Sequence, residues 1–261
     1  MLSADVRRRH ADSPGSARSA AAYNARRMKV HQQDPRSEEQ TDHPRYRSWV
    51  GPPHKYDRIG AMQFNLLTTI GLREHHFLLD VGCGSLRGGR LFIPYLLPGH
   101  YFGIEPEAWL VDEGIENELG RDVLRVKRPT FSDVSDFSLT VFGQDFDFVL
   151  AQSIFTHASA AQISACLAEA KKVLKPDGVM PATFFEGKKN YEGDGWVYPG
   201  GTRYRLEYLT SLAQDAGLDL APLDWSHPNK QKWVLISQPE HPAKTAGEEA
   251  DSPALELTTN A

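Results

Sequence analysis

Apolar and polar residues alternate with two different periods between residues 49 and 237. Short apolar runs between turn residues are typical of buried strands, and apolar residues three or four positions apart are typical of helices. The predicted strands are residues 77–81, 100–104, 123–126, 146–151, 179–185, 218–223 and 233–237. The predicted helices are residues 55–70, 90–97, 106–120, 162–174 and 206–216. Strands and helices that alternate in this way favour an α/β fold with a mostly parallel sheet.

Both ends of the chain are polar and lack this periodicity. Residues 1–48 begin with a basic stretch, and residues 238–261 are rich in Pro, Glu, Ala and Thr. Such composition is typical of segments that cannot bury enough apolar surface to fold. We therefore expect two disordered ends around one folded domain, residues 49–237, whose start is marked by Gly-Pro-Pro at residues 51–53.

A glycine-rich turn follows the predicted strand at residues 77–81. Asp80 stands near the end of this strand, Gly82 and Gly84 follow it, and a helix is predicted from residue 90. Glycines at such a turn allow a positive φ and a close approach of the backbone to a ligand. A strand, a glycine turn and a helix in this order bind nucleotides in doubly wound sheets.

The spacing of the turn separates two kinds of nucleotide. A dinucleotide site of the form G-x-G-x-x-G would have glycine at position 87, where this chain has Arg87. The carboxylate of Asp80 would also repel a pyrophosphate, whereas it would attract a positively charged ligand. The sequence therefore favours a cationic nucleotide over a nicotinamide cofactor.

The Asp80-x-Gly82-x-Gly84 sequence resembles the first motif of class I S-adenosylmethionine (SAM)-dependent methyltransferases. The resemblance extends over about residues 56–237, because later motifs follow in order, including Leu-Lys-Pro-Asp-Gly at residues 174–178. It implies a doubly wound, seven-stranded, mostly parallel sheet with an antiparallel last strand and helices on both faces. It also implies SAM as the cofactor, bound against Asp80, Gly82, Cys83 and Gly84.

Acidic residues at the ends of the next two strands are candidates for the rest of the cofactor. Glu105 comes about 20 residues after the glycines, where an acid binds the ribose hydroxyls of a nucleotide. By the resemblance, Asp133 accepts from the adenine amine and Val134 lies beside the ring. Asp136 competes for the adenine contact, and an Asp-rich turn would explain both acids without a ligand.

The resemblance implies that the segment after the strand at residues 146–151 lies beside the transferable methyl group. It contains Gln152, a candidate cofactor contact, and lacks the Asp/Asn-Pro-Pro-Tyr/Phe sequence of enzymes that methylate amino groups in DNA. DNA base methylation is therefore disfavoured, and Gln152 is not the acidic ligand that a magnesium-dependent reaction would need. His157 is the first candidate general base, because an imidazole takes up a proton near neutral pH. Glu186 is the second.

Two regions contain candidate substrate contacts. By the resemblance, the helix at residues 55–70 covers the cofactor, which makes Tyr56 and Gln63 candidates. The glycine-rich segment at residues 186–204 is long for a compact domain, and such segments are often functional. We expect its aromatic residues to line a substrate lid, although rings docked in an ordinary surface loop would explain them almost as well. These residues are Tyr191, Trp196 and Tyr198.

Composition narrows the function classes further. The formal net charge of −5 disfavours a general nucleic-acid binder, for which a basic face is typical. The two cysteines make neither a disulfide framework nor a zinc site, and we expect no metal. So few cysteines suit a reducing compartment, and we expect a cytoplasmic protein. No stretch of about 18 apolar residues is present, so we expect no segment that spans a membrane.

We therefore predict a SAM-dependent methyltransferase that acts on a small-molecule substrate. A SAM-binding protein without catalytic activity is the alternative, and a nicotinamide-dependent oxidoreductase is less favoured. Pro181 disagrees with this prediction, because a proline inside a central strand removes a hydrogen bond from the sheet. We expect a bulge or a local break at that position.

Overall fold

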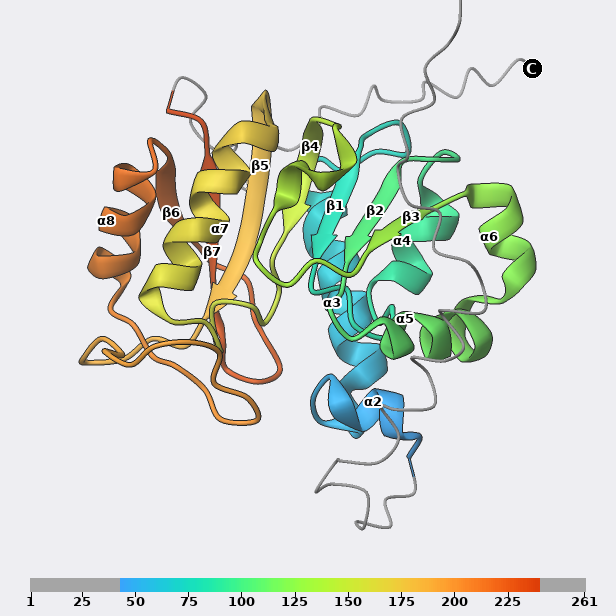
Figure 1. The fold of residues 1–261 in the computed structure, drawn as a ribbon, viewed down its shortest axis with the longest axis horizontal. Coiled ribbons are helices and arrows are strands. Elements are labelled where there is room, and N and C mark those ends of the chain that lie inside the picture. Colours follow the sequence, from blue (N-terminus) through green and yellow to red (C-terminus); the bar gives the residue numbers. More distant parts are fainter. Residues whose placement is uncertain (1–42, 240–261) are drawn as a thin grey trace, which may run out of the picture. The chain divides into compact units, whose positions relative to one another are not determined.

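The structure, a computed structural model, describes residues 43–239 and is built on one seven-stranded sheet (Figure 1). The strand order is β3-β2-β1-β4-β5-β7-β6. The first five strands in this order run parallel to one another, and β7 is antiparallel to both of its neighbours. The strands are β1 (Leu78–Val81), β2 (Tyr101–Ile104), β3 (Thr130–Ser132), β4 (Phe146–Leu150), β5 (Leu174–Phe184), β6 (Asp219–Leu223) and β7 (Lys232–Ser237). The predicted fold class is confirmed.

Helices cover both faces of the sheet (Figure 1). The α-helices are α2 (Arg45–Trp49), α3 (Tyr56–Thr69), α4 (Gly89–Tyr95), α5 (Ala108–Gly114), α6 (Arg121–Lys127), α7 (Ala160–Val173) and α8 (Leu206–Asp215). Shorter helical turns are η1 (Pro53–Lys55), η2 (Ile115–Leu119), which is π-helical, and η3 (Leu139–Phe142). Side chains of α7 and α8 join one apolar cluster, and those of α3 and α4 join another.

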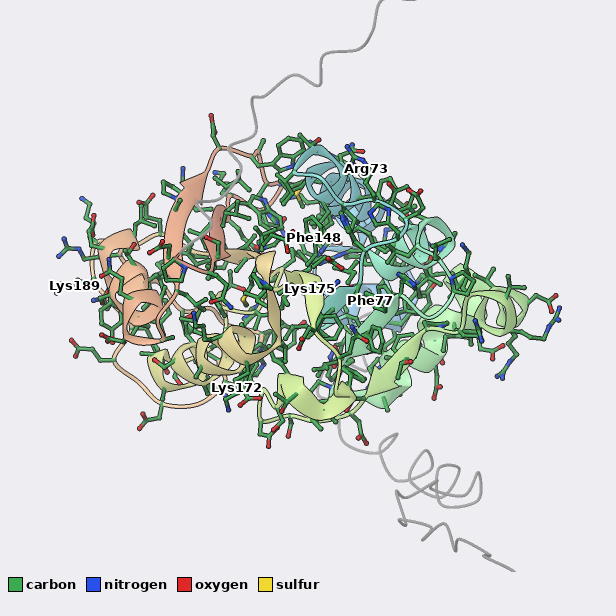
Figure 2. All side chains as sticks on the ribbon, turned by 90° about the horizontal axis from the view of Figure 1, so that it is seen from above. Arg73, Phe77, Phe148, Lys172, Lys175 and Lys189 are labelled. Carbon is green, nitrogen blue, oxygen red and sulfur yellow. The ribbon has the colours of Figure 1, made fainter. Side chains whose placement is uncertain are left out.

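Alternate side chains of each strand enter these two clusters, as the two-residue period of a strand requires. In β1, Leu79 and Val81 join the cluster that contains α7, whereas Leu78 joins the cluster that contains α3. Figure 2 shows side chains between the sheet and the helices on both sides. Burial on both faces explains why the parallel strands read as nearly continuous apolar runs.

The predicted strand at residues 123–126 is wrong. This stretch belongs to helix α6, and the third strand, β3, follows it at Thr130–Ser132. Asp122 and Arg125 form an ion pair at 3.6 Å between positions i and i+3 of this helix, a spacing that is typical of helices. Four residues are too few to distinguish a period of 2 from a period of 3.6.

Pro181 does not interrupt the pairing of β5 with β7, whereas the pairing of β5 with β4 is interrupted around it, as the expected local break requires. The register with β7 is continuous from Val179 to Phe184, and Pro181 pairs with Leu235. The Pro181 carbonyl accepts a hydrogen bond from the Ala151 N–H at 3.0 Å. The carbonyl and the missing N–H of Pro181 therefore both face β4, and the pairing with β7 loses no hydrogen bond. On the β4 side the regular pairing ends at Phe148 and Val179, and only an isolated bridge joins Ala151 to Ala182.

The folded part begins before the predicted boundary at residue 49. Helix α2 starts at Arg45 and its Tyr46 side chain is buried, which corrects the expectation of disorder for residues 45–48. The expectation for residues 1–42 and 240–261 lies outside the described residues. Between residues 43 and 239, no helix is long and apolar enough to span a bilayer.

Candidate functional site

The carboxyl ends of β1, β2, β3 and β4 meet at one edge of the sheet, and most of the predicted site residues lie there. Asp80 is in the last half of β1, and the glycine turn follows that strand. Glu105 follows β2, Asp133 follows β3 and Gln152 comes shortly after β4. Parallel pairing of these strands therefore gathers residues that are far apart in the sequence.

The glycine turn is hydrogen-bonded to the end of β2. The N–H groups of Gly82 and Cys83 both donate to the Ile104 carbonyl, at 2.8 and 3.0 Å. The Gly84 N–H donates to Oε2 of Glu105 at 3.0 Å. Gly82 (φ 70°) and Gly84 (φ 56°) both adopt the left-handed conformation that glycine tolerates best. The turn and Glu105 therefore form one connected unit.

Glu105 is a partly buried acid whose second oxygen, Oε1, accepts from the Glu107 N–H at 2.9 Å. Burial disfavours the charged form and raises the pKa of Glu105 to about 7, although the two backbone donors act in the opposite direction. A carboxylate in this position can accept hydrogen bonds from a vicinal diol.

Asp80 is buried and lies on the sheet face that α3 covers. Its Oδ2 accepts a hydrogen bond from the Tyr101 hydroxyl at 2.8 Å. Burial raises the pKa of Asp80 to about 6, whereas the Tyr101 hydrogen bond and the positive charge of Arg87 lower it. The end of β1 therefore has an acid with a cation nearby, rather than the isolated negative charge that the sequence suggested.

The candidate adenine contacts lie next to Glu105. The Glu105 N–H donates to the Ser132 carbonyl at 3.0 Å, so Asp133 and Val134 continue the chain from that point. Asp133 is exposed, and Val134 packs against the edge of the core. Oδ1 of the competing Asp136 accepts from the Ser138 N–H at 3.1 Å, an Asx turn that explains this acid without a ligand.

Gln152 is the centre of a buried polar network at the end of β4. Its Oε1 accepts from Nε2 of Gln63 at 2.7 Å and from Nη2 of Arg87 at 2.6 Å. Its Nε2 lies 3.1 Å from Nε2 of His227 and 3.3 Å from Oε1 of Gln231. Burial and the charge of Arg87 lower the pKa of His227 to about 4, so this imidazole is neutral at pH 7.

Three members of this network were not among the predicted site residues. In the sequence, Arg87 stands where a dinucleotide motif would have glycine, which shows its position in the turn but not its burial or its partners. His227 and Gln231 lie between β6 and β7. Their position beside β4 depends on the long-range strand order, which no local pattern reveals.

The two predicted contacts on α3 both face this region. The Tyr56 hydroxyl donates to the Ser85 carbonyl in the glycine turn at 2.8 Å, and burial raises its pKa to about 12. Gln63 reaches Gln152, as described above. The helix approaches the turn closely because of a glycine, since a Cβ on Gly88 would lie 2.6 Å from Oε1 of Gln63.

The segment before α3, which we call the strap (residues 45–52), lies against the glycine turn. A Cβ on Gly84 would lie 2.8 Å from Cγ1 of Val50. Nη1 of Arg87 donates to the Val50 carbonyl at 2.7 Å. The strap therefore covers one side of the turn.

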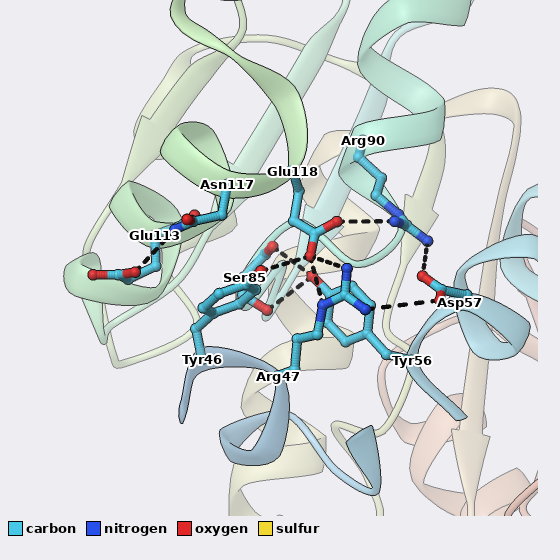
Figure 3. A network of polar contacts seen from close by, with 9 residues as sticks. All are labelled: Tyr46, Arg47, Tyr56, Asp57, Ser85, Arg90, Glu113, Asn117 and Glu118. Carbon is cyan, nitrogen blue, oxygen red and sulfur yellow. Dashed lines mark hydrogen bonds and ion pairs between the residues drawn. The ribbon is translucent and has the colours of Figure 1, made fainter. Parts of the chain in front are cut away.

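A buried carboxylate, Glu118 in η2, holds the strap in place (Figure 3). Its side chain is 3% exposed and lies 2.5 Å from Nη2 of Arg47 and 2.9 Å from Nη1 of Arg90. The Tyr46 hydroxyl donates to the same carboxylate at 2.8 Å. Asp57 lies 2.5 Å from Arg90 and 3.7 Å from Arg47, so one charge network joins the strap, α3, α4 and η2.

The aromatic segment at residues 186–204 packs on the loop that follows β4. Nδ1 of His157 lies 2.7 Å from the Gly200 carbonyl oxygen and 3.0 Å from that of Val197. Because a carbonyl only accepts, Nδ1 carries the proton and Nε2 of the neutral ring is left as an acceptor. The Tyr198 ring lies 5.1 Å from the His157 ring, and its hydroxyl donates to the Trp49 carbonyl of the strap.

The other two predicted aromatic contacts differ from each other. Trp196 is 47% exposed and its ring lies 5.5 Å from that of His157. Tyr191 packs against the core cluster that contains α7, as a docked ring would. Trp196 and Tyr198 therefore lie near the candidate base, and packing alone explains Tyr191.

Glu186, the second candidate base, lies apart from the polar network. It is exposed and lines an open depression of about 500 Å³ with Gly187, Lys188 and Arg203. Within residues 43–239, no three His, Cys, Asp or Glu side chains are grouped so that they could hold a metal ion.

A comparison with protein families matches the part of the chain that holds this site. Residues 79–180 match the family described as methyltransferase domain. The match runs from β1 into β5 and includes every residue that we predicted to contact the cofactor.

Solved structures with the same fold cover most of the chain at low identity. Magnesium protoporphyrin IX methyltransferase from Synechocystis PCC 6803, with bound SAH, is 16% identical with a TM-score of 0.54, over 74% of this chain and 92% of that chain. The CcbJ methyltransferase from Streptomyces caelestis is 15% identical with a TM-score of 0.53, over 76% and 100%. The glycopeptide N-methyltransferase MtfA, complexed with S-adenosyl-L-homocysteine (SAH), is 13% identical with a TM-score of 0.52, over 70% and 90%.

Proposed function

We propose that this chain is a SAM-dependent methyltransferase that transfers a methyl group to a small-molecule acceptor, and the matching methyltransferase domain and the shared fold support this. The observation that carries this proposal is the junction of the glycine turn with Glu105, where the Gly84 N–H donates to Oε2 at 3.0 Å. A nucleoside needs this combination of bare backbone and ribose-binding acid. Similar structures named for a porphyrin and a glycopeptide support an acceptor of small size.

The residues at four strand ends fit the cofactor. Asp80 would attract its cationic part, the backbone of residues 82–84 would lie along it, and Glu105 would bind its ribose. Asp133 and Val134 would contact the adenine, and Gln152 would lie beside the methyl group. Buried polar atoms without a partner, Oε1 of Gln63 and Nε of Arg87, support a ligand here, because such atoms are normally satisfied.

When bound, SAM supplies a methyl group that is already activated by its positive sulfur. The main task of the protein is then to hold the acceptor atom in line with that methyl group, which can contribute roughly 7–11 kcal/mol to the rate acceleration. His157 would remove the proton of the acceptor through Nε2, since Nδ1 is held by backbone carbonyls. Trp196 and Tyr198 would contact the acceptor from the neighbouring segment.

Two measurements test this function against its rivals. Thermal unfolding with SAH or NADH separates the methyltransferase from a nicotinamide oxidoreductase, and we expect stabilisation by SAH alone. Incubation with methyl-labelled SAM and cell extract from the source organism should then label a small molecule. Stabilisation by NADH would contradict the assignment of SAM as the cofactor. Binding of SAH without any labelled product would support a SAM-binding protein that is not catalytic.

A further inference from the structure

Arg87 is a buried cation that forms no ion pair within residues 43–239, and the nearest negative charge, that of Asp80, acts on it without direct contact. The whole residue is 8% exposed. Its two hydrogen bonds go to neutral oxygens, the Val50 carbonyl at 2.7 Å and Oε1 of Gln152 at 2.6 Å. Within residues 43–239, no carboxylate forms an ion pair with it.

The other arginines nearby show how unusual this is. Arg47 and Arg90 are more exposed, yet both are paired with Glu118 and Asp57. A buried charge is normally paired, and an arginine cannot lose its proton to avoid the cost of burial. The charge of Arg87 is therefore offset only by Asp80 at longer range, and within residues 43–239 no carboxylate contacts its guanidinium.

The donor groups of Arg87 are also incompletely used. Its Nε is buried without a hydrogen-bond partner, and so is Oε1 of Gln63, whose amide shares Gln152 with Arg87. A guanidinium binds a carboxylate through two parallel N–H groups, and Nε–H is one of those that remain. A carboxylate would satisfy both the missing charge and the missing hydrogen bond.

From these observations we propose that Arg87 is the receptor for a carboxylate of a bound ligand, at the junction of the glycine turn, α3 and the end of β4. This inference rests on the proposed function, which supplies two sources for the group. One is the amino-acid end of SAM, whose ammonium and carboxylate share one carbon and would match the neighbouring charges of Asp80 and Arg87. The other is an acidic methyl acceptor.

The test compares ligands with and without the carboxylate. SAH contains the amino-acid end, whereas 5′-methylthioadenosine is the corresponding thioether without it. Calorimetry with both ligands would use the wild type, Arg87→Gln and Arg87→Lys. Arg73→Gln is the matched control, because Arg73 also donates only to neutral carbonyls, those of Thr68 and Leu72, but is exposed. Thermal unfolding of each variant without ligand establishes that it is folded.

If the cofactor supplies the carboxylate, Arg87→Gln binds SAH roughly 10-fold to 100-fold more weakly and binds methylthioadenosine as the wild type does. Arg87→Lys falls between the two, because it keeps the charge and loses the fork. If the methyl acceptor supplies the carboxylate, Arg87→Gln binds both SAH and methylthioadenosine as the wild type does. Acetate, succinate or benzoate then stabilises the SAH-bound wild type and Arg73→Gln, but not Arg87→Gln.

The inference is overturned if Arg87→Gln and Arg73→Gln agree in both affinities and in their response to the three carboxylates. Failure of the proposed function looks different, because the wild type would then bind neither SAH nor methylthioadenosine. In that case the carboxylates, tested on the protein alone, still decide whether Arg87 binds an acid. If Arg87→Gln does not fold, the same comparison is made with Arg87→Lys.

Discussion

Glu105 is a residue whose ionisation links the stability of this protein to its binding site, and among the site acids its pKa is raised the furthest. Its pKa is raised from 4.5 to about 7 by burial. Between these values the folded state holds a proton that the unfolded state releases, so the free energy of unfolding falls as the pH rises from 4.5 to 7. Ionisation of this acid lowers the stability of the protein without ligand, and such a cost is common for residues that serve a binding site.

Substitution of Glu105 by Gln should therefore stabilise the free protein at high pH. We compare the free energy of unfolding of Glu105→Gln with that of the wild type. This difference should favour the variant by on the order of 2 kcal/mol more at pH 8 than at pH 5, because the neutral amide cannot ionise. Urea unfolding of both proteins at the two pH values measures it. An equal fall in stability between pH 5 and pH 8 for Glu105→Gln and the wild type would contradict the buried, raised pKa.

His157 is the residue for which the chemistry is most directly testable. If its Nε2 takes up the acceptor proton, His157→Ala should lower kcat by about 10²-fold to 10⁴-fold, once an acceptor is identified. The affinity for SAH should remain that of the wild type, because the ring contacts the segment at residues 186–204 and not the glycine turn. Full turnover by His157→Ala would remove the base role and leave the ring as an anchor for that segment.

Single residues were predictable from the sequence where a local pattern defines their chemistry. Asp80, the glycines and Glu105 follow from one strand-turn-helix pattern and one spacing, and the structure brings them together. Arg87 and His227 were not predictable in this way. Their surroundings come from β4, α3 and the segment between β6 and β7, so their burial depends on contacts between distant parts of the chain.

At the scale of elements, the strap is a structural feature that depends on one carboxylate. Arg47 and Arg90 approach each other because Glu118 lies between them, 2.5 and 2.9 Å away (Figure 3). Glu118→Gln would leave two half-buried cations with only the exposed Asp57 between them. We expect a loss of about 1–3 kcal/mol in the free energy of unfolding, which is below the value for a fully buried pair because both arginines contact solvent.

The measurement for Glu118→Gln is urea unfolding at low and high salt. Glu116→Gln is the matched control, since Glu116 belongs to the same turn and pairs with the exposed Arg121. The control should change stability by less than about 0.5 kcal/mol. Equal effects of the two substitutions would show that the Glu118 network does not hold the strap.

Elements were predicted best where an apolar pattern extends over many residues. The helices at residues 55–70 and 162–174 correspond closely to α3 and α7. The error at residues 123–126 came from a window in which valines and a leucine fit either period, and the strand that replaces it has only three residues. Such a short edge strand has little sequence signal of its own and depends on pairing with β2.

At the scale of the whole molecule, the order of the strands explains why one edge of the sheet has the chemistry. β1 lies in the middle of the parallel part, with β2 and β3 on one side and β4 and β5 on the other. The ribose and adenine candidates follow β2 and β3, and the candidate base follows β4. This order follows from the resemblance to known methyltransferases, whereas the docking of the strap and of residues 186–204 does not.

The central claim is that SAM binds across the glycine turn with Glu105 on its ribose, and calorimetry with SAH at pH 7.5 tests it most directly. The comparison is between the wild type, Glu105→Ala and Glu107→Ala, whose exposed side chain lies two residues away. We predict that Glu105→Ala binds SAH at least about tenfold more weakly and that Glu107→Ala binds it as the wild type does. Equal affinity of Glu105→Ala and the wild type, or no binding of SAH to the wild type, would contradict the account.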